Sequence, residues 1–181
     1  MSTAALSCWS NLFLLRPGRS SGMPKSPMIR LQHHQQAHSA SCLAACVVMA
    51  LAYWRLELSE VEVRRIIRTK PYAGTHPVNL INLGELGFDA WPYEGTEYEL
   101  RQRVVNGEPV IAFLWTGALS YWADRQGVDY LHTVVVSGWD ANVVVVHDPS
   151  LPDGPTEIAW AEFKDAWGYS RQMMAVVTPK Q

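Results

Sequence analysis

Hydrophobic and polar positions divide the chain into a helical first half and a strand-rich second half. Apolar residues cover nearly every side of the segment 42–54, a pattern that predicts a central, buried helix. The segment 58–70 is amphipathic, and Ser59 and Glu62 have the spacing of a capping box, with Pro71 as a stop. Shorter elements are expected as helices over 75–87 and 97–108 and as an extended piece over 88–95.

The second half contains strand-length runs of β-branched and apolar residues. The amphipathic segment 159–168, which precedes the last of these runs, predicts one more helix. Helices followed by strands predict an α+β domain whose sheet is mainly antiparallel. The expected strands cover residues 109–115, 130–139, 142–149 and 173–179.

Length and composition indicate one ordinary globular domain. The chain has 181 residues, of which 48% are hydrophobic and 18% charged. Its formal charge of −2 offers no basic surface for phosphate groups, so no nucleic acid partner is expected. No apolar run is long enough to span a membrane.

The first 28 residues differ from the rest of the chain. We interpret 1–28 as a flexible N-terminal extension or a mis-assigned start, and 29–181 as the folded domain. Cys8, Cys42 and Cys46 are odd in number and lack the spacing of a disulfide framework. A reducing, cytoplasmic location is therefore the prediction.

Cys42 lies where the polar segment "QQAHSAS" becomes the apolar helix. With Ser41 or Ser39 as the cap, its thiol would sit in the first helical turn, where the helix dipole favours a thiolate. The alternative is a buried structural cysteine. Gln36 precedes Cys42 by six residues, so its amide could fold back and join the Cys42 N–H as a donor to an oxyanion.

His132 and Asp148 lie in neighbouring predicted strands. His132 interrupts an apolar strand, so it is an edge group, a satisfied core group or a base. Asp148 closes the next strand. If the connection contains an odd number of residues centred on Asp140, the two residues lie directly opposite and share a face. Asp148 could then hold the imidazole in one tautomer. A connection with an even number would place them on opposite faces.

Several stretches together resemble the papain-like peptidases of the C39 type, the bacteriocin-processing or double-glycine leader peptidases. The stretches "QAHSASC" and "MALAYW" resemble the family's nucleophile helix, and "HTVVVSGWD" and "VVVVHDP" its two site strands. "EFKDAWGYS" and "MMAVVTP" resemble its last helix and strand. The similarity extends from about Ile29 to Pro179. It implies a papain-like cysteine peptidase fold.

The resemblance also implies roles for single residues. Cys42 would be the nucleophile, His132 the general base and acid, Asp148 the carboxylate that orients His132, and Gln36 the oxyanion donor. The substrate would be a peptide or protein, cleaved after small residues such as paired glycines. No metal or organic cofactor would be required. Without membrane or ATPase segments, the chain resembles a stand-alone domain, not an exporter.

One departure from the family pattern keeps other functions open. Family members have "D-C-G" around the nucleophile, whereas this chain has "S-C-L", and we expect Leu43 to narrow the cleft. A catalytically inactive peptide-binding domain would fit such a side chain. An acyl transferase would use the same triad, since only the acceptor of the acyl group differs. Trp139 and Trp115 are further candidates for shaping the substrate cleft.

A zinc site is the remaining alternative. His34, His38, Cys42 and Cys46 are spaced by four residues, so adjacent pairs could bind zinc if the helix extended through all of them. All four cannot converge on one ion, because positions i to i+12 of a helix span about 18 Å. The polar "SAS" also predicts that the helix begins only near residue 41.

Overall fold

The centre of the molecule is a six-stranded antiparallel sheet with the strand order β1-β6-β2-β3-β4-β5. The computed structural model describes residues 28–122 and 129–181; the predicted extension 1–28 therefore lies almost entirely outside the described residues. The strands are β1 Phe88–Glu94, β2 Val110–Trp115, β3 Leu131–Trp139, β4 Val143–His147, β5 Thr156–Ala159 and β6 Met173–Pro179.

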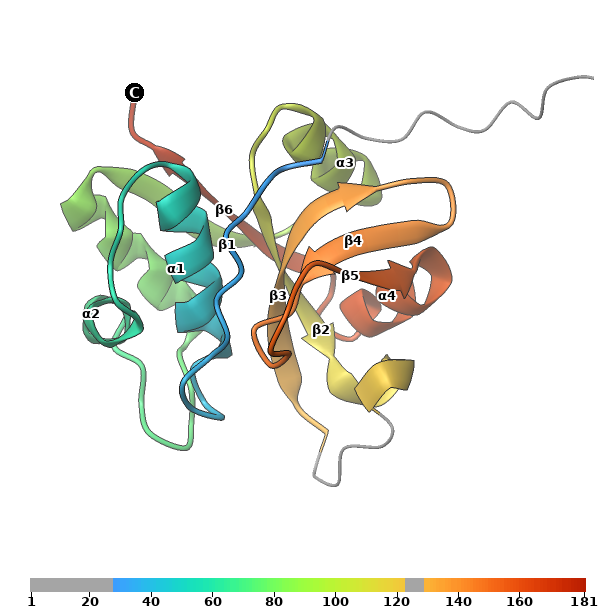
Figure 1. Ribbon diagram of the computed structural model, residues 1–181, viewed down its shortest axis with the longest axis horizontal. Helices are drawn as coiled ribbons and strands as arrows, with labels where there is room; N and C mark the ends of the chain where they lie inside the picture. Colours follow the sequence, from blue (N-terminus) through green and yellow to red (C-terminus); the bar gives the residue numbers. More distant parts are fainter. Residues whose placement is uncertain (1–27, 123–128) are drawn as a thin grey trace, which may run out of the picture.

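Helices cover both faces of this sheet (Figure 1). Successive side chains of β2 point to opposite faces of the sheet and so contribute to both hydrophobic layers. Ile111 and Phe113 pack toward α1, whereas Ala112 and Leu114 pack toward α4. The predicted α+β class is confirmed. One face carries α1 Cys42–Tyr53, α2 Glu60–Ile66 and the 3-10 helix η1 Pro77–Leu86, and the other carries α3 Glu97–Val105 and α4 Trp160–Gly168.

The helix α1 is the buried helix that the apolar run predicts. Eight of its 12 residues are buried, and it packs mainly on β3. The predicted capping box of α2 is also confirmed, since the Ser59 side chain accepts from the Glu62 N–H and Glu62 accepts from the Ser59 N–H. However, α2 ends at Ile66, several residues before Pro71.

Two short elements differ from the expectation. The helix expected over 75–87 is a 3-10 helix, which begins at Pro77 and is tied to the end of α2 by hydrogen bonds from Asn79 and Asn82 side chains. The strand β5 was not expected. It has only four residues, too few to show an alternating pattern, and forms because the edge of β4 offers free backbone groups.

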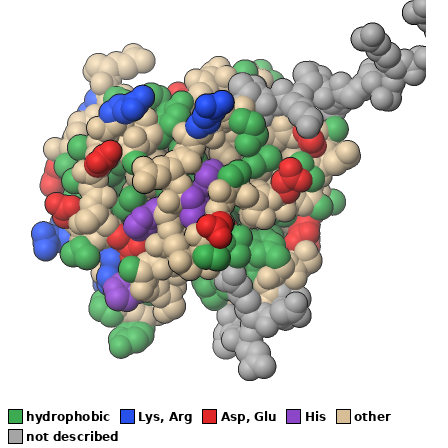
Figure 2. All heavy atoms as spheres, in the orientation of Figure 1, with side chains coloured by type: hydrophobic (Ala, Val, Ile, Leu, Met, Phe, Trp, Pro, Cys, Tyr) green, Lys and Arg blue, Asp and Glu red, His purple; other side chains and the backbone are tan. Residues whose placement is uncertain are grey.

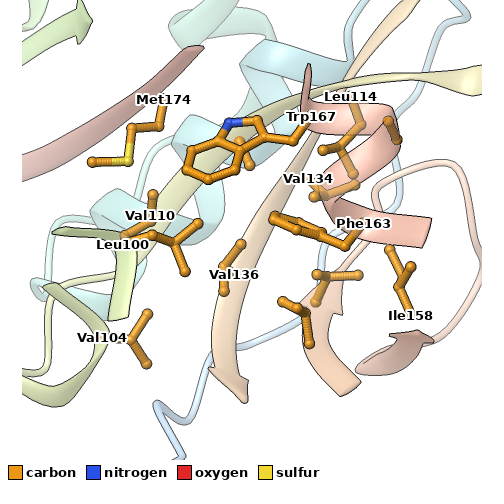
Figure 3. Packing of buried hydrophobic residues seen from close by; sticks show 14 of the residues in the cluster. Leu100, Val104, Val110, Leu114, Val134, Val136, Ile158, Phe163, Trp167 and Met174 are labelled. Atoms are coloured by element: carbon orange, nitrogen blue, oxygen red, sulfur yellow. The ribbon is translucent and has the colours of Figure 1, made fainter. Parts of the chain in front are cut away.

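The second hydrophobic layer fixes the sheet from the α4 side. Phe163 and Trp167 of α4 are fully buried, and Figure 3 shows their rings over Val134 and Val136 of β3. Replacing either ring by alanine would cost about 3–5 kcal/mol of unfolding free energy. This layer holds β3, the strand that carries His132, in a fixed position.

Candidate active site

Cys42 is the first residue of α1, as the sequence predicts. Ser41 occupies the N-cap position, but the expected capping by its side chain is wrong. Its hydroxyl donates to the His38 carbonyl at 2.8 Å and accepts from the His38 N–H at 3.1 Å. These bonds stabilise the tight turn before the helix, and the hydroxyl does not cap the helix amides. The amides of the first turn have no side-chain cap, and their positive partial charge lies beside the Cys42 thiol.

His132 is the second residue of β3, and its side chain is fully buried. Its Nε2 lies 2.7 Å from Oδ1 of Asp148, which follows β4 and is also fully buried. Nε2 therefore donates to the carboxylate, and Nδ1 is the nitrogen left to interact with Cys42. Nδ1 is buried and forms no well-aligned hydrogen bond among the described residues. Catalytic hydrogen bonds are often loose before substrate binds.

A β-bulge brings His132 and Asp148 to the same face of the sheet. At the hairpin end Trp139 pairs with Val144, so the connection between them has an even number of residues. That register alone would place Asp148 and His132 on opposite faces. The register shifts at Ser137, beyond which Val136 pairs with Val146.

The shifted register corrects the expected pairing. Continued by two residues, it sets Asp148 beside Val134. His132 lies two residues from Val134 along β3, so the pair is diagonal and not directly opposite. The N-terminal segment contacts this bulge, since the Ile29 N–H donates to the Ser137 carbonyl at 2.8 Å.

The three groups form a coupled charge system. Burial alone would raise the pKa of Cys42, but the polar contact with His132 and the positive charge of that ring lower it below the usual value. Burial would lower the pKa of His132, yet the hydrogen bond with Asp148 and the contact with the Cys42 thiol raise it to about 9. For Asp148, hydrogen bonding to His132 outweighs burial and holds its pKa well below the usual range. A thiolate–imidazolium pair is therefore favoured near neutral pH.

Sequence reasoning missed two partners of Asp148. Ser150 donates to Oδ1 through its backbone N–H at 2.8 Å and its hydroxyl at 2.6 Å, a turn that "DPS" could have indicated. The Tyr121 hydroxyl donates to Oδ2 at 2.7 Å. No local pattern indicates this contact, because Tyr121 is 27 residues away in the sequence.

Gln36 lies on the loop before α1 and is half-buried. Its backbone N–H donates to the Pro149 carbonyl at 2.8 Å, which ties this loop to the residue after Asp148. Its amide Nε2 donates to the His38 carbonyl at 2.7 Å. This bond uses one of the two amide hydrogens, and the second is not engaged by any described residue.

A cleft of about 520 Å³ opens at Cys42. Tyr130 and Leu131 line it from the strand that leads to His132, and Tyr72 lines it from a turn bridged between Lys70 and Gly74. Tyr72 is fully exposed and has a φ of 63°, a left-handed conformation that is costly for a bulky residue.

The residues expected to shape this cleft lie elsewhere. Leu43 is only 3% exposed and belongs to the hydrophobic core on the α1 side of the sheet, because its position on the helix points it away from the opening. The expectation that Leu43 narrows the cleft is wrong. Trp139 instead packs against Arg101, and Trp115 stacks on Tyr169; neither lines the cleft.

Histidines outside the site have other partners. Because α1 begins at Cys42, His34 and His38 precede it and share no helical stripe with the cysteines. His34 lies 3.0 Å from the Glu60 carboxylate. His147 is buried and stacks on the half-buried His33. Figure 2 shows histidine side chains on the face of the molecule turned to the viewer. Within residues 28–122 and 129–181, no group of three or more ligand residues is placed to hold a metal ion.

Comparison with known proteins identifies the family. The Peptidase C39 family model matches residues 30–181, most of the chain. The chain belongs to the Peptidase C39 family. It is thereby classed with cysteine peptidases, as the sequence motifs predict. No curated protein matches this C39 chain at a significant level. Across the described part of the chain, no helix has the length and apolar character needed to cross a membrane.

Solved structures of C39 peptidases share the fold. A C39-like peptidase from Bacillus anthracis is 17% identical with a TM-score of 0.71, covering 87% of this chain and 99% of that one. A double-glycine-motif protease of an AMS/PCAT transporter, solved with the leader peptide, is 20% identical with a TM-score of 0.64, covering 86% and 98%. The peptidase domain of Streptococcus ComA, a bifunctional ABC transporter of a quorum-sensing pathway, is 16% identical with a TM-score of 0.63, covering 84% and 99%.

Proposed function

We propose that this C39 chain hydrolyses peptide bonds with a Cys42–His132–Asp148 triad. The observation that carries the proposal is the joint burial of His132 and Asp148, 2.7 Å apart, with the imidazole turned to a thiol at an uncapped helix start. These are the three roles that thiol peptidases require: a nucleophile, a base and a group that orients the base.

The reaction follows from this arrangement. The Cys42 thiolate attacks the carbonyl carbon, and the developing oxyanion is stabilised by the Cys42 N–H and the second amide hydrogen of Gln36. The His132 imidazolium gives its proton to the leaving amine, and a thioester remains on Cys42. Water then attacks this thioester while His132 accepts a proton, the carboxylic acid product leaves, and the thiolate is restored. Asp148 keeps the ring oriented throughout.

The cleft supports a peptide substrate. It opens directly at Cys42 and is walled by Tyr72 and Tyr130, whose flat side chains can border an extended chain. A related C39 protease is known in complex with a leader peptide. We therefore propose cleavage after small residues such as Gly-Gly. The inactive peptide-binding alternative loses its main support, because Leu43 is buried away from the cleft.

The test is cleavage of a peptide library that contains Gly-Gly and Gly-Ala sites, read by mass spectrometry. Cys42→Ala and His132→Ala should lose nearly all activity, and Gln36→Ala should fall by roughly 100- to 1000-fold. Gln35→Ala is the matched control, since Gln35 is the exposed neighbour of Gln36 and should leave the rate near normal.

Three results would overturn the proposal. Cleavage that Cys42→Ala retains would exclude Cys42 as the nucleophile. Peptide binding without cleavage by the wild type would establish the binding-domain alternative. Transfer of the acyl group to an added amine, in place of hydrolysis, would establish an acyl transferase.

A further inference from the structure

The two oxygens of the Asp148 carboxylate have very different surroundings. Oδ1 accepts three hydrogen bonds, one from His132 Nε2 and two from Ser150. Oδ2 has a single donor among the described residues, the hydroxyl of Tyr121 at 2.7 Å. Because Asp148 is fully buried, that hydroxyl substitutes for water at Oδ2 within the described part of the chain.

A short 3-10 turn, η3 Ser120–Trp122, presents Tyr121 to the carboxylate. The turn is anchored at its start: the Ser120 N–H donates to the Glu162 carboxylate of α4, and the buried Leu119 precedes it. The next residue, Trp122, places its ring edge-on to the His132 imidazole, with the centroids 5.1 Å apart. One turn thus brings two aromatic side chains onto the His132–Asp148 pair.

We propose that Tyr121 is a positioning residue that fixes the rotation of the Asp148 carboxylate and limits the negative charge that Oδ1 presents to His132. The inference rests on the proposed function of the triad and extends it to a fourth side chain. Tyr121 contacts Asp148, and through Asp148 and His132 it acts on the thiol.

The physical reason is the sharing of charge within one carboxylate. A donor on Oδ2 draws negative charge toward that oxygen, and a donor's position defines the plane of the group. Without the hydroxyl, more charge resides on Oδ1, and the imidazolium is held more strongly. Among the described residues, the titratable groups near His132 are Asp148, Cys42 of α1 and Tyr130, whose ring centroid lies 6.0 Å from that of the imidazole. Removing the Tyr121 hydroxyl should therefore raise the pKa of His132.

The experiment compares Tyr121→Phe with the wild type and with Tyr98→Phe, a matched control whose ring is 71% exposed on α3. The pKa of His132 is measured by NMR titration of ¹³C-labelled histidine. Peptide cleavage is measured per titrated active site. Tyr121→Phe should raise the His132 pKa and lower kcat by about 10-fold, with little change in KM. Tyr98→Phe should match the wild type in both.

A second variant tests the opposite direction at constant shape. Replacing Tyr121 by 3,5-difluorotyrosine strengthens the donor, so the His132 pKa should fall relative to the wild type. An unshifted His132 pKa in this variant and in Tyr121→Phe overturns the inference, even if kcat falls, because packing alone would then explain the loss. If Tyr121→Phe does not fold, the His132 pKa of the difluorotyrosine variant alone tests the inference. The NMR reading does not depend on cleavage, so an inactive wild type would refute the proposed function separately.

Discussion

Replacing Asp148 by asparagine tests the triad with little change of shape. The asparagine Oδ1 can still accept from His132 Nε2 and from Ser150, as the aspartate does. Its Nδ2 can donate to the Tyr121 oxygen, because a phenol accepts as well as donates. The substitution therefore removes the negative charge and keeps the hydrogen-bond pattern.

The expected loss follows from the difference between a charged and a neutral hydrogen bond. A bond to a charged group contributes about 1.5–3 kcal/mol and a neutral one about 0.5–1.5 kcal/mol, so the imidazolium loses about 1–2 kcal/mol. At about 1.4 kcal/mol for each factor of ten, kcat/KM near neutral pH should fall roughly 5- to 30-fold. Oxyanion stabilisation is untouched, so the variant should keep measurable activity.

The pH dependence of kcat/KM tests the role of the Asp148 charge more directly than the rate at a single pH does. In the wild type the pKa of His132 is raised to about 9, so the thiolate–imidazolium pair is lost only as the pH rises through that value. Asp148→Asn removes the main cause of this rise, and the alkaline limb of kcat/KM should move toward lower pH. The loss of activity should therefore be greater at about pH 9 than at about pH 6.

The assay is kcat/KM for a fluorogenic peptide from about pH 5 to about pH 10, with active sites titrated. Asp153→Asn is the control, since Asp153 is exposed on the loop after Asp148 and makes no ion pair among the described residues. An Asp148→Asn profile with the wild-type alkaline limb would refute the role of Asp148 in holding the imidazolium. A thermal unfolding curve excludes loss of fold as the cause.

Three further predictions concern residues around the site. Limiting iodoacetamide at about pH 6 should label Cys42 well before Cys46, because burial and the charge of Cys42 raise the pKa of Cys46 well above the usual thiol value. Mass mapping measures the labelling of each cysteine, and equal labelling would contradict this prediction. Because Leu43 is buried in the core, Leu43→Gly should lower the unfolding free energy, measured by urea denaturation, by about 3–5 kcal/mol without increasing cleavage. An increase in kcat/KM would instead indicate that the Leu43 side chain blocks the cleft. Burial and the charge of His33 lower the pKa of His147 to about 4, so on acidification the unfolded chain binds a proton before the folded one does. The Tm should therefore decline as the pH falls from about 6.5 to about 4. His147→Gln should reduce this decline, and an equal decline in the variant would contradict the assignment.

The sequence predicted most of the secondary structure because those signals are local. The apolar run of α1, the capping box of α2 and the β-branched strands each depend on neighbouring residues. Cys42 at a helix start and the family motifs came from the same kind of pattern. An element too short to show an alternating pattern was not predicted, as with the four-residue strand β5.

The relation between His132 and Asp148 was decided by the tertiary structure. Hairpin spacing alone leaves their shared face open, and the bulge at Ser137 determines it. A bulge depends on what the extra residue contacts, here the Ile29 N–H from a distant segment. The side-chain direction of Leu43 and the contact of Tyr121 with Asp148 were likewise hidden, because they depend on how separate elements pack together. The sequence determined which chemical groups this C39 chain carries, and long-range packing decided which of them meet.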